Sequence, residues 1–293
     1  MNMPLQLVYK ATTSIPVELD ALSFAALHDM SLAEIKRILI AHGNERRPLA
    51  EFFSVTGSAA DGRIEFEGDL SGVHGIGTKL SAGTTIHVEG HVGRHLGSEM
   101  TGGEIHVSGD AGDWVGGEMS GGLIHVRGRA GNLVGSAYRG SRRGMTGGTI
   151  LIDGPVGNEL GHTMRRGLVA VGGCGDFAGI NMIAGTILVF GPAGIRAGAG
   201  MRRGTIGLLG NEPARLLPTF RAGGRDKLLV LQLVLRELSR LDYRFDPALL
   251  NANYRMHHGD LVTGGRGELL VPERAVGPEG SCPTLHGRDF SRD

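Results

Sequence analysis

Cysteine is almost absent from this chain of 293 residues, which contains only Cys174 and Cys282. The two thiols lie far apart and have none of the spacings typical of a metal-binding motif. This pattern favours a reducing compartment and excludes a disulfide framework. Cys174 is not expected to be a catalytic nucleophile, because a reactive thiol needs an electropositive neighbourhood that no motif supplies.

Long apolar runs, a charged leader and an excess of one charge are also missing. Lys+Arg and Asp+Glu both number 30, so the formal net charge is zero. No run approaches the length of a membrane span, and the N-terminus does not resemble an export signal. We therefore expect a cytoplasmic protein with no membrane or nucleic-acid partner. Nearly all of the positive charge is arginine, which suits anion recognition better than lysine does.

Glycine, in contrast, is abundant, and its 51 residues recur in register with short apolar triplets. Successive triplets begin 19, 19, 26, 19, 18 and 19 residues apart, and a glycine stands four residues after the start of each. The triplets span residues 86–88, 105–107, 124–126, 150–152, 169–171, 187–189 and 206–208. Self-similarity at a nearly fixed period is typical of a repeat architecture.

The repeat has the chemistry of short strands. The segments between glycines are too short for α-helices, the triplets are rich in β-branched residues, and glycine suits positive-φ corners. The pattern predicts an all-β solenoid, a single-stranded right-handed parallel β-helix in which each strand pairs with its counterpart one unit on. Short helical caps are expected at both ends. The triplet ends and a row of methionines from Met100 to Met201 would fill the interior.

Three segments are predicted along the chain. Residues 1–50 would form an N-terminal cap with a helix that opens at a capping box on Ser31. Residues 51–210 would form about eight coils of the β-helix, with residues 138–144 bulging out as a loop. Residues 211–293 would hold an amphipathic helix from Asp226, a loop leading to a strand near residues 269–271, and a polar tail.

Three histidines occupy the outward position of successive triplets. His87, His106 and His125 are expected to stack as a ladder. No carboxylate is expected to orient the rings as metal ligands, so the row predicts no metal site. No Ser-His-Asp order, phosphate loop or dinucleotide fingerprint is present either, and no catalytic residue is predicted.

The same outward row turns apolar further along the chain, at Leu151, Ala170 and Leu188. An exposed apolar strip favours a protein contact. Trp114, the only tryptophan, also falls at an outward position and suits an interface anchor. Leu151, Leu188 and Trp114 are therefore the candidate interface residues.

Arginine pairs recur at one corner of the repeat. Arg165-Arg166 and Arg202-Arg203 precede their triplets at the same place, and Arg142-Arg143 lie close to the equivalent corner. The corner is either a solvated edge or a basic edge for an anionic chain, since guanidinium groups pair bidentately with carboxylates and phosphates. All six arginines are candidate residues for such binding.

The glycine repeat, the capping helix and the stretch Leu216-Leu217-Pro218-Thr219-Phe220 resemble the C subunit of formylmethanofuran dehydrogenase. The ending, with Gly259-Asp260 and Gly265-Arg266-Gly267-Glu268, resembles the closing motif of that family. The likeness covers residues 5–270 and is closest to the bacterial counterpart, the C subunit of the formyltransferase/hydrolase complex of methylotrophs. The repeat alone is also similar to the C-terminal domain of glutamate synthase large subunits.

The resemblance implies a non-catalytic structural subunit of a hetero-oligomeric complex in one-carbon metabolism. Catalytic partner subunits would transfer a formyl group between a tetrahydropterin and a methanofuran or methylofuran carrier and release formate. The metal and the carrier would belong to those partners, and no cofactor is expected on this chain. Because the resemblance implies a carrier with a glutamate tail, it makes the arginine corner a candidate site for that tail.

Three alternatives stay open from the residues. The chain could be the C subunit of an archaeal-type formylmethanofuran dehydrogenase, or a scaffold domain of a glutamate-synthase-type assembly. It could also be a carbohydrate-active β-helix enzyme, although the sequence offers no carboxylate cluster for that chemistry.

Overall fold

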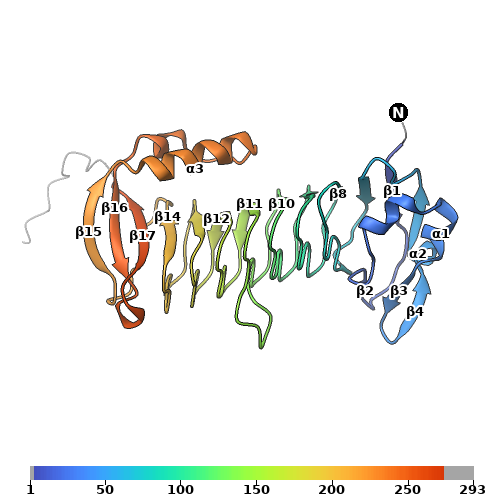
Figure 1. Cartoon of the computed structure of the whole chain (residues 1–293), viewed down its shortest axis with the longest axis horizontal. Helices are drawn as coiled ribbons and strands as arrows, with labels where there is room; N and C mark the ends of the chain where they lie inside the picture. The colour runs from blue at the N-terminus through green and yellow to red at the C-terminus, as the bar shows by residue number, and fades with distance from the viewer. Residues whose placement is uncertain (1–2, 274–293) are drawn as a thin grey trace, which may run out of the picture.

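Two β-sheets organise the molecule (Figure 1). The computed structural model describes residues 3–273, so Cys282 and nearly all of the predicted tail lie outside the described residues. The larger sheet has 13 strands in the order β15-β16-β17-β14-β13-β12-β11-β10-β9-β8-β6-β1-β5. The smaller sheet has four strands in the order β4-β3-β2-β7.

The glycine repeat supplies the centre of the large sheet, where all neighbours are parallel. Its strands are β6 (Arg63–Glu67), β8 (Thr85–Glu89), β9 (Glu104–Val107), β10 (Leu123–Val126), β11 (Thr149–Val156), β12 (Leu168–Cys174), β13 (Thr186–Val189) and β14 (Gly204–Leu208). Ile105 pairs with Ile86 on one side and with Ile124 on the other, and the same register continues to Ile206. The predicted pairing of each triplet with its counterpart is confirmed.

The prediction of a single-stranded parallel β-helix with helical caps at both ends is wrong, because the large sheet is mixed. At one end β1 (Leu5–Tyr9) lies between β6 and the antiparallel β5 (Phe53–Thr56). At the other end β17 (Gly267–Pro272) pairs with β14 in parallel, and β16 (Tyr254–Gly259) and β15 (Arg221–Asp226) follow antiparallel. The glycines that form the corners of each coil do not recur outside the repeat. The chain there reverses direction between neighbouring strands, so those strands pair antiparallel. The predicted loop before the strand near residues 269–271 is only partly correct, because Tyr254–Gly259 form strand β16 and the loop is limited to the residues between β16 and β17.

The N-terminal segment contains the small sheet and short helices. Its strands are β2 (Val17–Glu18), β3 (Leu39–His42), β4 (Glu45–Pro48) and β7 (Val73–His74). The helical turns of the chain are η1 (Ala25–Asp29), α1 (Leu32–Arg37), α2 (Leu49–Phe52), η2 (Pro247–Leu250) and η3 (Leu261–Thr263). The predicted capping box is confirmed, since the Ser31 hydroxyl accepts from the Glu34 N–H and the Ser31 N–H donates to the Glu34 carboxylate. The three predicted segment boundaries stay a prediction.

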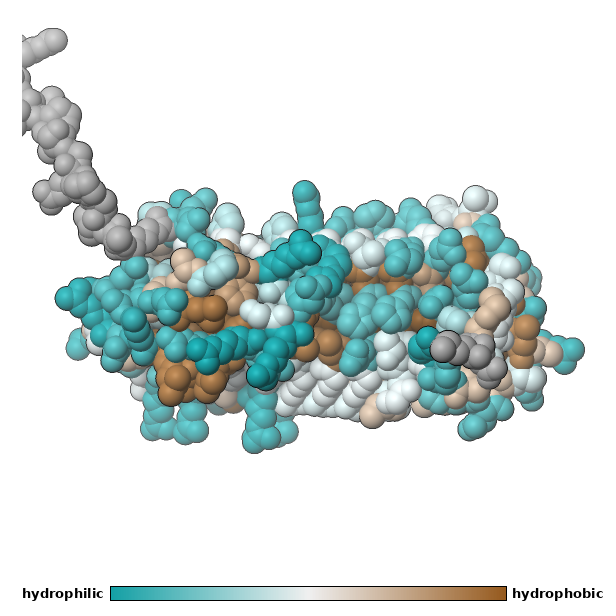
Figure 2. Space-filling model, turned by 90° about the horizontal axis from the view of Figure 1, so that it is seen from above, coloured by the Kyte–Doolittle hydropathy of each residue, from teal (hydrophilic) through white to brown (hydrophobic). Residues whose placement is uncertain are grey.

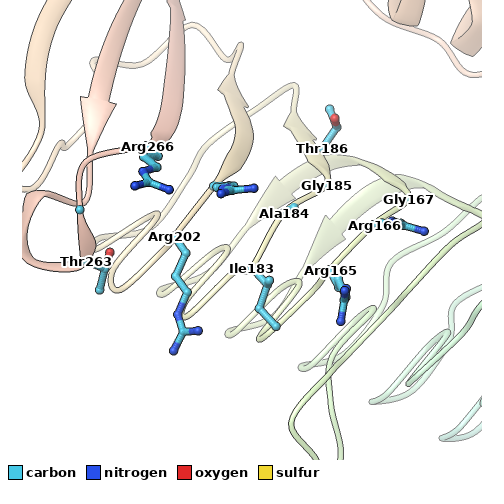
Figure 3. A pocket seen from close by; sticks show the side chains of 12 residues that line it. Arg165, Arg166, Gly167, Ile183, Ala184, Gly185, Thr186, Arg202, Thr263 and Arg266 are labelled. Carbon is cyan, nitrogen blue, oxygen red and sulfur yellow. The ribbon is translucent and has the colours of Figure 1, made fainter.

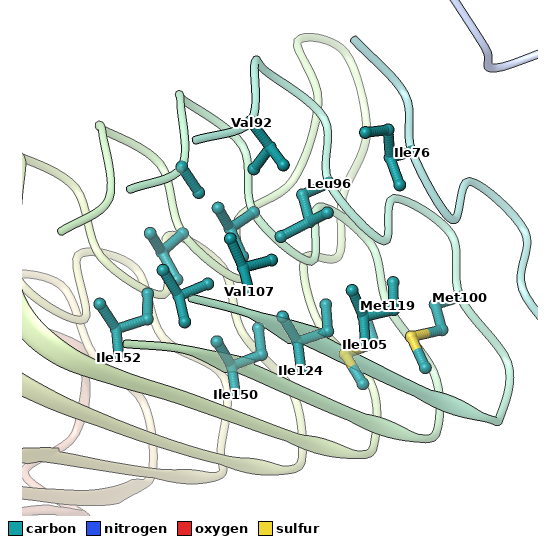
Figure 4. Close-up of a cluster of buried hydrophobic side chains, with 14 of the residues drawn as sticks. Ile76, Val92, Leu96, Met100, Ile105, Val107, Met119, Ile124, Ile150 and Ile152 are labelled. Carbon is teal, nitrogen blue, oxygen red and sulfur yellow. The ribbon is translucent and has the colours of Figure 1, made fainter. Parts of the chain in front are cut away.

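Apolar side chains of successive strands and corners stack into rows inside the repeat (Figure 4). Ile105, Ile124 and Ile150 form one row and are fully buried. The methionines that close the repeat units are fully buried as well, at positions 100, 119, 145, 164, 182 and 201. The predicted interior is therefore confirmed, with flexible methionines filling space beside the stiff β-branched rows.

The long helix α3 (Leu229–Arg240) lies along the flank of the large sheet (Figure 1). Its buried residues Leu231, Leu235 and Leu238 belong to a cluster that also contains Leu151 and Leu188. The helix thus seals the outward apolar row of β11 to β13 within the chain. None of the helices in the described range is long and apolar enough to cross a membrane.

Candidate functional site: a groove lined by arginine

Five arginines line one groove beside the corners that precede β12, β13 and β14 (Figure 3). The groove has a volume of about 790 Å³ and is lined by Arg165, Arg166, Arg202, Arg203 and Arg266. The corners before β12 and β14 carry the two pairs, and the segment between η3 and β17 carries Arg266. No carboxylate is among the residues that line it.

Backbone hydrogen bonds fix the spacing of the two pairs. The N–H groups of Arg165 and Arg202 donate at 2.8 Å to the carbonyls of Met145 and Met182, each one repeat unit back. Strand β13 lies between β12 and β14, so the pairs are two strands apart, or about 9–10 Å. Ile183 stands at the same corner of the intervening unit and places an apolar side chain between Arg165 and Arg202 (Figure 3). The predicted common corner for these two pairs is confirmed.

Asp260 holds the segment that brings Arg266 and Thr263 to the groove. Asp260 is 6% exposed, and its carboxylate accepts hydrogen bonds of 3.0 Å from the N–H groups of Gly200 and Val262. Burial by itself would raise the pKa of Asp260, but these hydrogen bonds lower the pKa below its ordinary value. The ionised carboxylate therefore ties the closing segment to the last repeat unit.

The groove is a concentrated positive site on a chain of zero net charge. In the part of the chain that the structure describes, none of its five guanidinium groups forms an ion pair. Arg165 is half-buried and the other four are exposed. Each guanidinium offers five N–H donors in a planar fork that matches a carboxylate or a phosphate. The arrangement is suited to an extended ligand that carries several anionic groups.

The groove differs from the predicted arginine edge in two ways. Arg142 and Arg143 lie in the loop before β11, which projects from the row of strands, and they do not line the groove (Figure 1). Arg266 does line it but was not predicted, although its motif was recognised. Its neighbourhood depends on the pairing of β17 with β14, in which Gly267 lies opposite Gly204. No local sequence pattern signals that contact.

The predicted interface residues fall in two different environments. Leu151 and Leu188 are fully buried against α3, so the prediction that they meet a partner is wrong. Trp114 is half-buried in an aromatic stack, 5.6 Å from the ring of His95 and 6.0 Å from that of Tyr138. Its role as an interface anchor stays a prediction.

The histidine row is only partly a ladder. The rings of His87 and His106 stack at 5.0 Å with an interplanar angle of 13°, as predicted. His125 instead lies 2% exposed, with Nε2 2.9 Å from an Asp153 carboxylate oxygen. His106 also pairs with a carboxylate, that of Glu104 at 3.1 Å. The expectation that no carboxylate orients these rings is therefore wrong, because the flanking positions of the strands supply them.

Comparisons with known proteins identify relatives of two related kinds. The GXGXG motif family matches residues 77–216. The C subunit of molybdenum-containing formylmethanofuran dehydrogenase 1 from Methanothermobacter thermautotrophicus is 43% identical over 92 residues, which are 31% of this chain and 23% of that protein. The corresponding subunit from Methanosarcina barkeri is 41% identical over 94 residues, 31% of each chain. The C subunit of the tungsten-containing dehydrogenase 2 from Methanothermobacter wolfeii is 40% identical over 93 residues, 30% of this chain and 34% of that protein.

A solved structure matches over a much greater length. It is a chain of the formyltransferase/hydrolase complex (FhcABCD) from Methylorubrum extorquens, whose crystal structure contains methylofuran. The TM-score is 0.84 with 34% sequence identity, and the match covers 92% of this chain and 100% of that chain. The matches to the curated dehydrogenase subunits, by contrast, span between 23% and 34% of the length of those proteins.

The names of the dehydrogenases raise the question of whether this chain could hold their metal. Within residues 3–273 no group of three or more His, Cys, Asp or Glu side chains could bind an ion. Burial raises the pKa of the Cys174 thiol to about 11, which disfavours the thiolate that a metal would need. The described residues thus do not fit a molybdenum or tungsten site.

The resemblance inferred from the repeat and its flanking motifs is confirmed by these relatives. The solved chain is matched over its full length at 34% identity, and the curated relatives all carry the name of the same dehydrogenase component. The protein belongs to the family of formylmethanofuran dehydrogenase C subunits, which also includes their counterpart in the formyltransferase/hydrolase complex.

Proposed function

We propose that the chain is a structural subunit of a formyltransferase/hydrolase-type complex of one-carbon metabolism. The observation that carries this proposal is the 34% identity to a chain of that complex, across 92% of this chain. Catalytic partner subunits would transfer a formyl group between a tetrahydropterin and a methanofuran-type carrier and release formate. This chain would hold those partners and bind no cofactor of its own.

Exposed apolar side chains support a role in assembly. Leu229, Val230 and Leu233 of α3 are 68%, 75% and 55% exposed, on the side of the helix that faces away from the sheet. Figure 2 looks onto the α3 side of the molecule, where hydrophobic residues reach the surface in several places. Covering such side chains with a partner stabilises the complex by about 25 cal/mol per Å² of apolar surface buried. A long, stiff sheet can present them at a fixed position to a partner subunit.

We further propose that the arginine groove guides the anionic tail of the carrier between partner subunits. Two arginine pairs about 9–10 Å apart can contact carboxylates on one extended chain. Exposed ion pairs contribute only about 0–1 kcal/mol each. Several weak contacts would therefore steer a tail without immobilising it, which a carrier that visits more than one active site requires.

The groove is tested with two matched double variants in the assembled complex. R202Q/R203Q should raise the KM for the carrier several-fold at low ionic strength and leave kcat unchanged. The reason is that positive charges in the groove speed the association of the anionic carrier with the complex but do not act on the reacting group. The effect should shrink at high salt through screening. R142Q/R143Q removes the same charge outside the groove and should change neither constant. An unchanged KM in R202Q/R203Q, or equal effects of both variants on KM, would contradict the proposal that the arginine groove guides the carrier tail.

The structural role is tested by co-expression with the partner subunits. Pull-down of the chain should recover the catalytic subunits, and the chain alone should not hydrolyse formyl substrates. A dehydrogenase-type complex is the second candidate, favoured by the 43% identity to the C subunit of such an enzyme over 92 residues. Recovered subunits that oxidise the formyl carrier would favour the second candidate. A chain that purifies alone under all conditions would contradict both.

A further inference from the structure

An apolar step separates the two arginine pairs of the groove. Arg165, Ile183 and Arg202 occupy the same place in three successive repeat units, because each donates its N–H at 2.8 Å to the methionine carbonyl one unit back. Ala184 follows Ile183 where the two outer units carry their second arginine. The corner therefore alternates from cationic to apolar and back to cationic, and Figure 3 shows Ile183 between Arg165 and Arg202.

The positive charge is concentrated at the two ends of this step. Strand pairing sets the arginine pairs about 9–10 Å apart. Arg266 adds a third guanidinium at the β14 end, because the next residue, Gly267, pairs with Gly204. No carboxylate is among the residues that line the groove. Like charges at this separation repel one another, so an anion at each end would stabilise the groove.

The apolar step indicates what should join those two anions. Ile183 and Ala184 are half-buried, and their side chains have no hydrogen-bonding group. A polar centre of a ligand would lose water there without gaining a partner, which costs free energy. Methylene groups would instead remove apolar surface from water. The groove volume of about 790 Å³ is within the range of about 300–1,000 Å³ found for small-molecule sites.

We propose that the groove binds a linear dicarboxylate whose two carboxylates are about 9–10 Å apart and joined by methylene groups. Each carboxylate would accept hydrogen bonds from the guanidinium groups of one end, and the methylene groups would cover Ile183. The inference rests on the proposed function, since it names the kind of segment that the groove recognises in the carrier tail. Binding itself needs no partner subunit, because this chain supplies both ends of the site.

Selectivity for ligand length follows from the fixed spacing of the two ends. Once one carboxylate is bound, the second binds at a high effective concentration, provided that the spacer can reach the other end. Nonanedioate, with carboxylates about 10 Å apart when extended, can reach both ends, whereas pentanedioate, at about 5 Å, cannot. The groove should therefore distinguish two ligands that have the same charge.

Isothermal titration calorimetry of the full chain at low ionic strength tests this selectivity. Nonanedioate should bind with a dissociation constant on the order of 1 mM. Pentanedioate should bind about tenfold more weakly because it is too short. Nonanoate, which has the same apolar chain but one carboxylate, should also bind about tenfold more weakly, which separates the effect of the second charge from that of the methylene groups.

Ile183→Arg changes the charge spacing without removing an arginine. It places guanidinium groups on three successive units, about 4.8 Å apart, so pentanedioate should gain about tenfold in affinity and match nonanedioate. Ile195→Arg is the control, because Ile195 is 37% exposed and does not line the groove. It adds the same charge and should leave nonanedioate the tighter ligand. Since Arg165 and Arg202 already occupy the equivalent places, Ile183→Arg should fold.

Three outcomes overturn this inference. They are nonanedioate titrations without saturation, equal affinities of the unmodified chain for nonanedioate and pentanedioate, and the same order of affinities in Ile183→Arg and Ile195→Arg. Far-ultraviolet circular dichroism checks the folding of each variant before titration. The proposed guiding role fails separately, through an unchanged KM of R202Q/R203Q in the assembled complex. A raised KM together with equal affinities for the two dicarboxylates would overturn the selectivity for length and leave the guiding role standing.

Discussion

Gly109 allows a quantitative test of how the repeat units stack. A Cβ added there would lie 2.5 Å from the carbonyl oxygen and 2.7 Å from the carbonyl carbon of Gly90. The Gly109 N–H also donates to that carbonyl at 3.1 Å, so the two backbones cannot separate without losing a hydrogen bond. The sequence pattern predicts glycine corners with positive φ, but Gly109 is not among the positive-φ residues. Close approach of the neighbouring unit is what requires glycine here.

Two opposing terms set the effect of Gly109→Ala on the free energy of unfolding. Replacing glycine by alanine stabilises by about 0.4–1 kcal/mol through the unfolded chain when the native backbone accepts it. Overpacking costs about 1–3 kcal/mol. The clash should win, with a net loss of about 1–2 kcal/mol and more for Gly109→Val. For a chain of this size, each 1 kcal/mol lowers Tm by about 2–4 °C.

Gly72→Ala is the matched control for this prediction. A Cβ at Gly72 would have no heavy atom within 4 Å, so the variant should unfold like the unmodified protein or slightly later. Thermal unfolding followed by far-ultraviolet circular dichroism measures both variants. If Gly109→Ala and Gly72→Ala unfold within about 1 °C of each other, the stacking argument is wrong.

Three further predictions concern α3, the closing segment and the buried thiol. Leu235→Ala should lower the free energy of unfolding by about 2–5 kcal/mol and expose α3 to proteolysis, since Leu235 is fully buried against the sheet. Although burial opposes it, hydrogen bonding lowers the pKa of Asp260, so its stabilisation is present above about pH 4 and is lost as the pH falls through the lowered value. Asp260→Asn should therefore flatten the acid side of the pH–stability curve, and unchanged curvature would contradict the role of this carboxylate. In a Cys282→Ser background, native Cys174 should resist iodoacetamide at pH 8, because burial raises its pKa to about 11; rapid labelling of the folded chain would contradict its burial.

The register of the central strands could be predicted because its signal is local. Each unit repeats a triplet and a glycine, so Ile105 must face Ile86 and Ile124 once the strands pair. The ends of the sheet carry no such period. Pairing of Arg221 with His258 joins segments that share no motif, so the antiparallel strands could not be seen in the sequence.

The arginine groove was only partly predictable for the same physical reason. Arg165 and Arg202 recur with the repeat, which places them on one corner. Arg266 reaches that corner through β17, whose partner β14 lies about sixty residues earlier in the chain.

The position of α3 moves the expected contact surface from the strands to the helix. The outward row runs from His87 and His106 to Leu151 and Leu188, and it turns apolar where α3 covers it. The apolar strip therefore serves to dock the helix, and its burial stabilises the chain itself. The apolar side chains still free to meet a partner here are those on the outer side of α3, such as Val230. A partner that binds the outer side of α3 would contact a helix that Leu151 and Leu188 hold in place on the sheet. Binding of the partner should therefore stabilise the docked position of α3, and loss of docking should weaken assembly.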